Sequence, residues 1–290
     1  MKKVSIALLL TLVLVLSTFG MAGAIKNGEL DGDGHPYVGL MVALDEDGNP
    51  LWRCSGTLVS PELFITAGHC TEEPATSAVI WFDEGPITTD PNFDPAVGCT
   101  ADFEPAGTGY PCVGDATGTT HTHPDYDPNA FLLYDLGVVV LDDPYETEGN
   151  VYAELPERDD VGLLDAYEFK RGQNKVTFTA VGYGLQRSFP DAASWKDEAE
   201  RVRMVAYPRL IQINKGGLVG SFSVLLSNNA NTGGTCFGDS GGPIFLGDTN
   251  LIVGVTSYGV NATCAGTGGV YRIDQEDDLK WLYEEFGQYF

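Results

Sequence analysis

Residues 238–243 read Gly238-Asp239-Ser240-Gly241-Gly242-Pro243, and this stretch places a serine between glycines. A serine hydroxyl is a weak nucleophile unless a neighbouring base takes its proton. Glycines beside it let the backbone turn sharply and come close to a bound substrate. The stretch therefore predicts a nucleophilic serine, Ser240. The same Gly-x-Ser-x-Gly spacing also occurs in α/β hydrolases, so a second observation has to separate the two kinds of enzyme.

The order of the histidines and aspartates along the chain makes that separation. In α/β hydrolases the acid and the histidine follow the serine, whereas all four histidines of this chain precede it. The remaining order is histidine, aspartate, serine. It selects His69 as the base, from Thr66-Ala67-Gly68-His69-Cys70, and Asp135 as the acid, from Tyr134-Asp135-Leu136-Gly137-Val138-Val139. An aspartate directly before an apolar strand can be held in a dry place against an imidazole.

Three other groups of residues could compete with this interpretation. Asp125 and Asp127 are rival acids, but their proline-containing loop is expected to be solvated. His121 and His123 form a His-x-His pair, which we interpret as surface histidines in preference to a metal site. The acidic turns at 31–34 and 45–50 lack the full calcium-loop pattern, so we expect ordinary solvated loops.

Taken together, the segments around His69, Asp135 and Ser240 resemble the three signature motifs of trypsin-like serine proteases. The resemblance runs from Ile25 to about residue 286, and it is weakest at 83–120, which we interpret as a surface insertion. It implies an all-β fold of two antiparallel six-stranded β-barrels with the catalytic residues between them. The protease domain would span 25–290, with its halves at about 25–150 and 151–290.

Short apolar runs and turn residues agree with an all-β chain, and no regular alternation of strands and helices suggests an α/β sheet. A helical spacing of apolar residues near the C-terminus predicts a helix over 274–286. The predicted strands are Tyr37–Leu44, Leu51–Ser60, Gly137–Leu141, Val176–Tyr183, Arg201–Tyr207, Ile244–Leu246, Leu251–Ser257 and Val270–Ile273.

The resemblance also implies a role for each site residue. Ser240 would attack the peptide carbonyl, His69 would take and return the proton, and Asp135 would orient His69. The N–H groups of Gly238 and Ser240 would form the oxyanion hole. Substrate contacts are expected at the pocket base (Gly234 and Thr235), along an edge segment (Ser257, Tyr258 and Gly259) and on the pocket wall (Gly259 and Gly269). Such an open pocket without a fixed charge predicts cleavage after large apolar or aromatic residues.

The N-terminus has the features of a secretory signal peptide, residues 1–24. Two lysines precede the apolar run Ile6–Phe19, which is too short to span a bilayer and ends near the small-residue site Ala22-Gly23-Ala24. Cleavage there would leave Ile25 at the terminus. The resemblance implies that the amine of Ile25 pairs with Asp239 and orders the oxyanion loop. We therefore expect a secreted enzyme, extracellular or periplasmic, that signal removal activates.

Export permits disulfide bonds, and the chain has six cysteines. Six cysteines allow 15 connectivities, and spacing alone does not choose among them. The resemblance implies the pairs Cys54–Cys70 and Cys236–Cys264, which leaves Cys99–Cys112 as the third.

The formal charge of −25 repels nucleic acid and anionic lipid. We interpret this charge as a means of staying soluble, in preference to a means of attracting cationic substrates. We expect polypeptide substrates, protein protease inhibitors as further partners, no nucleic acid, no membrane once the signal is removed, no cofactor or metal, and a monomer. An inactive secreted binding protein on the same fold is the alternative. Such relatives usually lose a catalytic residue, and none is lost here.

Overall fold

The computed structural model describes residues 24–88, 110–111, 113–167, 176–186, 200–215 and 220–290. The predicted signal peptide up to Gly23 and the predicted Cys99–Cys112 pair lie outside these residues. Within the described part, no helix is both long and apolar enough to cross a membrane.

The N-terminal half forms a closed β-barrel in the strand order β2-β3-β4-β7-β6-β5. Strand β2 is buried at all seven positions, because one face fills the barrel and the other packs against neighbouring parts of the molecule. Its register with β3 places Met41 opposite Cys54, and with β5 it places Met41 opposite Ile80. The strands of this barrel are β2 Val38–Leu44, β3 Pro50–Leu58, β4 Leu63–Thr66, β5 Ser77–Trp81, β6 Ala116–Thr122 and β7 Gly137–Leu141.

The C-terminal half is one antiparallel sheet in the order β1-β9-β8-β12-β13-β14-β11-β10. Its strands are β1 Glu29–Leu30, β8 Phe178–Gly182, β9 Met204–Ala206, β10 Leu210–Lys215, β11 Gly220–Asn228, β12 Pro243–Leu246, β13 Ile252–Gly259 and β14 Gly266–Arg272.

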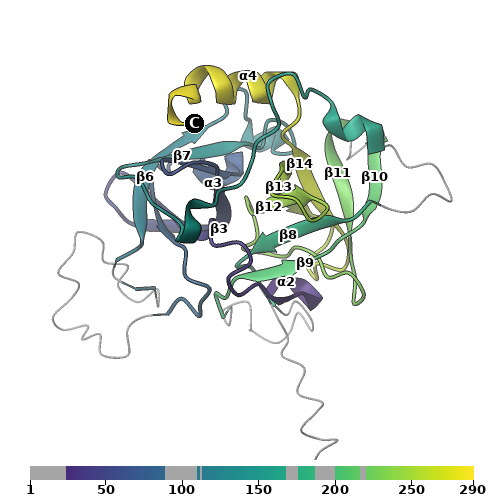
Figure 1. Ribbon diagram of the computed structural model, residues 1–290, viewed down its shortest axis with the longest axis horizontal. Coiled ribbons are helices and arrows are strands. Elements are labelled where there is room, and N and C mark those ends of the chain that lie inside the picture. The colour runs from purple at the N-terminus through teal and green to yellow at the C-terminus, as the bar shows by residue number, and fades with distance from the viewer. Residues whose placement is uncertain (1–23, 89–109, 112, 168–175, 187–199, 216–219) are drawn as a thin grey trace, which may run out of the picture.

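A bend at Pro208 closes most of this sheet into a second six-stranded circuit. Proline lacks the N–H that a strand ladder needs, so it interrupts the segment 204–215 between β9 and β10. Before Pro208, β9 pairs with β8, and after it, β10 pairs with β11. Strands β8 and β11 lie toward opposite ends of the strand order. A bridge between Thr177 and Arg209 joins the start of β10 back to β8. Figure 1 shows the two halves side by side.

Helical segments are short except for the one at the C-terminus. Helix α4 (Glu276–Glu285) buries Leu279 and Leu282 and begins with three acidic residues, which suit the positive end of a helix dipole. The others are α2 Ala24–Asn27, α3 Gly68–Thr71 and the 3₁₀ turns η1 Pro128–Ala130, η2 Glu148–Asn150, η3 Leu163–Tyr167 and η5 Gly287–Tyr289.

The predicted insertion at 83–120 is too long at its C-terminal end. Residues 116–120 belong to β6, which pairs with both β5 and β7 inside the first barrel. Glycine and threonine hide this strand from an apolar pattern, although β-branched threonine fits a pleated sheet well.

One core joins the two halves of the molecule. Val181, Tyr183 and Phe245 come from the second sheet, yet they belong to the same buried cluster as the first barrel. The hydroxyl of Tyr183 donates to the carbonyl of Asp83 at 2.7 Å and lies 3.2 Å from the carbonyl of Val38. The halves are therefore fixed relative to each other, which is what a site built from both requires.

Candidate active site

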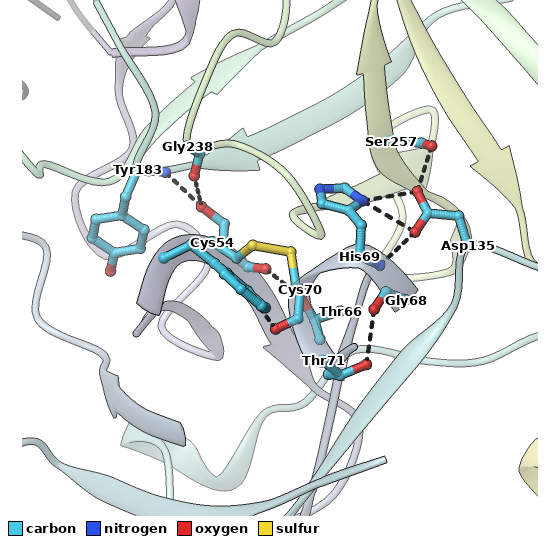
Figure 2. The surroundings of a disulfide bond; sticks show 12 residues. Cys54, Thr66, Gly68, His69, Cys70, Thr71, Asp135, Tyr183, Gly238 and Ser257 are labelled. Atoms are coloured by element: carbon cyan, nitrogen blue, oxygen red, sulfur yellow. Dashed lines mark hydrogen bonds and ion pairs between the residues drawn. A yellow bond between two sulfur atoms is a disulfide. The ribbon is translucent and has the colours of Figure 1, made fainter. Parts of the chain in front are cut away.

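His69 and Asp135 are in direct contact on the side of the first barrel. His69 lies in α3 just after β4, and Asp135 lies just before β7, and these two strands pair. The Nδ1 atom of His69 is 3.0 Å from Oδ2 of Asp135, and the backbone N–H of His69 donates to Oδ1 at 2.9 Å. Figure 2 shows both contacts. Two hydrogen bonds to one carboxylate fix the imidazole and its backbone together.

Ser257 on β13 supplies a further contact to the same carboxylate. Its hydroxyl donates to Oδ2 of Asp135 at 2.5 Å. The carboxylate is fully buried, whereas the His69 side chain is 23% exposed. Ser257 was predicted to contact substrate through its backbone, and its hydroxyl contacts the acid. The sequence does not indicate this contact, because it joins residues 122 positions apart.

The charge of Asp135 controls the proton affinity of His69. Burial alone lowers the pKa of His69, but the charge of Asp135, the hydrogen bond to it and the charge of Glu72 together raise that pKa above the usual 6.5. The protonated imidazole is therefore stabilised at this position.

The loop that carries Ser240 is attached to β3. The N–H of Ser55 donates to the carbonyl of Ser240 at 2.7 Å, and the Ser55 hydroxyl donates to the carbonyl of Gly238 at 2.9 Å. Gly241 has φ 76°, and a Cβ on it would lie 2.0 Å from the hydroxyl of Thr66. A side chain at that position would push the loop away from the segment that leads to His69.

Ser240 lines the same pocket as Ser257, which contacts Asp135, but it is not bonded to the His69–Asp135 pair. Its hydroxyl makes no hydrogen bond to His69 or to any other residue in the described ranges. Hydrogen bonds of this kind often tighten only when substrate binds. The N–H groups of Gly238 and Ser240 likewise donate to no protein acceptor in the described part of the chain, so both remain available to a ligand oxygen.

A pocket of about 130 Å³ opens beside Ser240. It is lined by Thr235, Cys236, Phe237, Ser240, Thr256, Ser257, Tyr258, Gly259 and Cys264. None of these side chains carries a charge. Strand β13 pairs with β14 on one side and with β12 on the other, but the pairing with β12 ends at Val255. The β12 side of residues 257–259 therefore has no strand partner among the described residues. An extended peptide could add there as a strand.

Two predicted pocket residues lie behind the lining instead of in it. The ring of Tyr258 covers Gly269, where an added Cβ would lie 2.3 Å from the ring. The side chain of Asn228 packs against Gly234 and donates to the carbonyl of Thr235 at 2.6 Å. Neighbouring side chains occupy the space beside these two glycines, whereas Gly259, the other predicted wall glycine, lines the pocket.

Ile25 and Asp239 form no ion pair in the described residues. The nitrogen of Ile25 is part of the peptide bond to Ala24, and the Ile25 side chain is fully buried beside β8 and β9. The Asp239 carboxylate accepts hydrogen bonds from the N–H groups of Gly184 and Cys236 at 2.7 and 2.8 Å. No cation in the described residues pairs with it, and burial raises its pKa to about 7.

Two disulfides brace the site, and they join the pairs that the resemblance implied. Cys54–Cys70 connects β3 to the residue after His69. Cys236–Cys264 connects the loop before Ser240 to the segment before β14. The cluster of Cys54, His69 and Cys70 has metal-like spacing, but its two sulfur atoms are bonded to each other and cannot both bind a metal as thiolates.

The competing residues are placed elsewhere. The carboxylate of Asp127 accepts hydrogen bonds from Asn129 in its own turn, and the N–H of Asp125 donates to His123. His123 is buried, contrary to the expectation of a surface residue, and its ring stacks on Tyr134 at 4.9 Å. This stack supports Tyr134, whose φ of 54° is unusual for a residue with a side chain and which directly precedes Asp135.

Comparison with known proteins places this geometry in a family. A trypsin from Saccharopolyspora erythraea is 25% identical over 245 residues, which cover 82% of this chain and 87% of that protein. Serine protease 1 of Drosophila melanogaster is 27% identical over 270 residues, 91% of this chain and 86% of that one. The solved structure of HL collagenase superimposes with a TM-score of 0.64 at 20% identity, covering 90% and 98% of the two chains.

The sequence model of the trypsin family matches residues 112–278, more than half of the chain. This match includes Asp135 and Ser240, while His69 precedes it. The chain therefore belongs to the trypsin family of serine proteases.

Proposed function

We propose that this protein is a serine endopeptidase in which Ser240, His69 and Asp135 form the catalytic triad. The observation that carries the proposal is the buried Asp135 carboxylate, which holds both the backbone and Nδ1 of His69. This arrangement leaves Nε2 as the atom that can take a proton from a serine hydroxyl. Ser240 lies in the adjacent pocket, as the nucleophile must.

The reaction would proceed through an acyl-enzyme. His69 removes the Ser240 proton as the hydroxyl attacks the scissile carbonyl, and Asp135 stabilises the resulting imidazolium. The carbonyl oxygen, now negative, accepts hydrogen bonds from the unused N–H groups of Gly238 and Ser240. His69 then gives its proton to the leaving amine, and water repeats the sequence to release the acid product.

The pocket supports cleavage after apolar residues, including large or aromatic ones. Its lining carries no charge that would select lysine or arginine. Tyr258 closes one wall over Gly269, while Thr235 stays in the lining near the base. An uncharged side chain loses little when it leaves water for such a pocket, whereas an unpaired ammonium group would lose much.

We further propose that the enzyme is secreted and acts as a monomer on polypeptides outside the cytoplasm. Two disulfides in the described residues fit an oxidising compartment. Protein inhibitors would use the same unpaired edge at 257–259 as substrates. The alternative function is that of an inactive binding protein, which would not need a reactive hydroxyl at Ser240.

The test is labelling and digestion with the purified chain that begins at Ile25. A fluorophosphonate should label Ser240 and no label should appear in Ser240→Ala, whose peptidase turnover should fall by about 10⁶. A peptide-library digest should show cleavage after apolar residues. A folded wild-type protein that neither labels nor cleaves would establish the inactive alternative, and cleavage mainly after lysine or arginine would reject the proposed pocket specificity.

A further inference from the structure

Arg53 places a cation against the loop that carries the nucleophile. A Cβ built on Gly238 would lie 2.7 Å from Nη2 and 3.2 Å from Cζ of Arg53, so the guanidinium packs directly on the Gly238 backbone. Arg53 and Ser55 share one face of β3, because side chains two positions apart point the same way. Ser55 is bonded to the same loop. Arg53 is therefore held at this position by the strand.

Within the described part of the chain, Arg53 has no acidic residue at ion-pair distance, whereas three other arginines do. Arg203 pairs with Asp31 at 3.0 Å, Arg272 with Asp274 at 2.7 Å and Arg158 with Glu284 at 2.5 Å. Arg53 forms no ion pair or hydrogen bond with any residue that the structure describes, although the chain has 41 acidic and only 16 basic residues. The charge of Arg53 acts at longer range on the buried Asp239 carboxylate. Its N–H groups nevertheless have no acceptor among the described residues, so they can donate to an anionic ligand.

A second arginine increases the positive charge at this point. Arg201 packs over the ring of Tyr110 at 3.7 Å and donates to the carbonyl of Ile87. It is close enough for the charge of Arg53 to lower its pKa, after the larger effect of burial. Two cations near each other repel, and an anion between or beside them would relieve that repulsion.

The position of Arg53 relative to the pocket identifies which part of a substrate it can meet. The pocket is built by the second half of the molecule and does not include Arg53. Arg53 lies on β3 of the first barrel and directly precedes Cys54 in the chain. Figure 2 shows the disulfide from Cys54 to Cys70. A peptide with the residue before the scissile bond in the pocket would place its scissile carbonyl at the N–H groups of Gly238 and Ser240. Arg53 packs on Gly238 from the side of the first barrel, so we expect the leaving segment to run past Gly238 toward β3.

We propose that Arg53 forms a binding site for an acidic side chain in the leaving part of the substrate, one or two residues after the scissile bond. The inference rests on the proposed peptidase function and adds a specificity that the pocket does not provide. A carboxylate there would form a charge-assisted hydrogen bond with the guanidinium. In an acidic protein, this site would let substrates with an acidic leaving segment bind despite the overall charge.

The test uses quenched fluorescent peptides that share one sequence before the scissile bond and carry Glu, Gln or Lys at the two positions after it. The measured quantity is the ratio of kcat/KM for the Glu and Gln peptides, which we expect to be about tenfold in the wild type. Arg53→Gln should bring this ratio close to one, and Arg53→Glu should favour the Lys peptide. Raising the salt concentration should reduce the wild-type ratio.

The matched control is Arg158→Gln, which removes an arginine paired with Glu284 and should keep the wild-type ratio. The same peptides are also bound to Ser240→Ala protein, with and without Arg53→Gln, and followed by fluorescence anisotropy. This binding comparison tests the Arg53 site even if the protein proves unable to cleave. Glu and Gln peptides with equal kcat/KM and equal Kd in proteins that retain Arg53 would overturn the proposal.

Discussion

Asp135 connects the pH dependence of the proposed catalysis to one side chain. Only neutral His69 can accept the serine proton, so activity should fall as pH drops through the pKa of His69. That pKa is raised above 6.5, since the effects of Asp135 and Glu72 outweigh burial. In Asp135→Asn the acidic limb of kcat/KM should move to lower pH, and kcat should fall by about 10⁴.

The control for this experiment is Asp127→Asn, which removes an exposed carboxylate that is bonded only within its own turn. It should leave both the limb and kcat near the wild-type values. An acidic limb at the same pH in wild type and folded Asp135→Asn would show that Asp135 does not set the proton affinity of His69.

The candidate triad could be found from the sequence because motif chemistry and chain order constrain it independently. Ser240 lies between glycines, and the histidines all precede it. The contacts that tune the site could not be found in the same way. Ser257 reaches Asp135 only through contacts between distant parts of the chain, and the Tyr258 ring covers Gly269 because β13 and β14 pair with these two residues opposite each other.

At the scale of elements, strands differ in how plainly their residues reveal them. Strands β2 and β7 were predicted because they are rich in buried apolar residues. Strand β3 was predicted as well, although only Cys54 and Leu58 among its buried positions are apolar side chains. Strand β6 was missed because threonine and glycine dominate it, and its place between β5 and β7 depends on the whole barrel. The bend at Pro208 follows from proline chemistry, but its use in closing the second circuit depends on β8 and β11.

The two disulfides should affect the enzyme through different elements. Cys54–Cys70 closes a separation of 16 residues, and its removal should cost about 3 kcal/mol of unfolding free energy on the chain-entropy model. Because it ties β3 to the residue after His69, Cys54→Ala/Cys70→Ala should mainly lower kcat. Denaturant titration measures the stability, and steady-state kinetics measures the separate changes in kcat and KM.

The matched variant is Cys236→Ala/Cys264→Ala, which opens a separation of 28 residues and should cost slightly more, about 3.5 kcal/mol. Both cysteines line the pocket, so this variant should mainly raise KM. Identical changes in kcat and KM for the two double variants would contradict the assignment of the disulfides to separate parts of the site.

At the scale of the whole molecule, removal of the signal peptide should change both stability and activity through Asp239. Burial raises the pKa of Asp239 from 3.8 to about 7 while the Ile25 nitrogen remains in a peptide bond. The folded precursor then holds a proton that the unfolded chain has lost. Precursor stability should therefore fall as pH rises from about 4 to 7.

A free amine at Ile25 would reverse this effect. Paired with the amine, Asp239 would ionise at lower pH. The pKa of the amine would be raised above its usual value of about 8. The stabilisation from the carboxylate is present above its unfolded pKa, and that from the amine is lost as pH rises through the raised value. A buried pair that loses one partner costs about 3–5 kcal/mol, so the oxyanion loop should disorder without the amine.

The experiment compares a chain that begins at Ile25 with one that begins Met-Gly-Ser before Ile25, with both termini verified by mass spectrometry. The chain beginning at Ile25 should be the active one. Its advantage in unfolding free energy should grow from pH 4 to 7 and shrink in alkaline solution, because both partners must be charged. An internal cation that reached Asp239 would make the amine unnecessary, and Arg53 is the described arginine whose charge already acts on that carboxylate. Equal peptidase activity in the two chains would reject activation by the amine. Loss of that activity in Arg53→Gln would then identify Arg53 as the cation that replaces the amine.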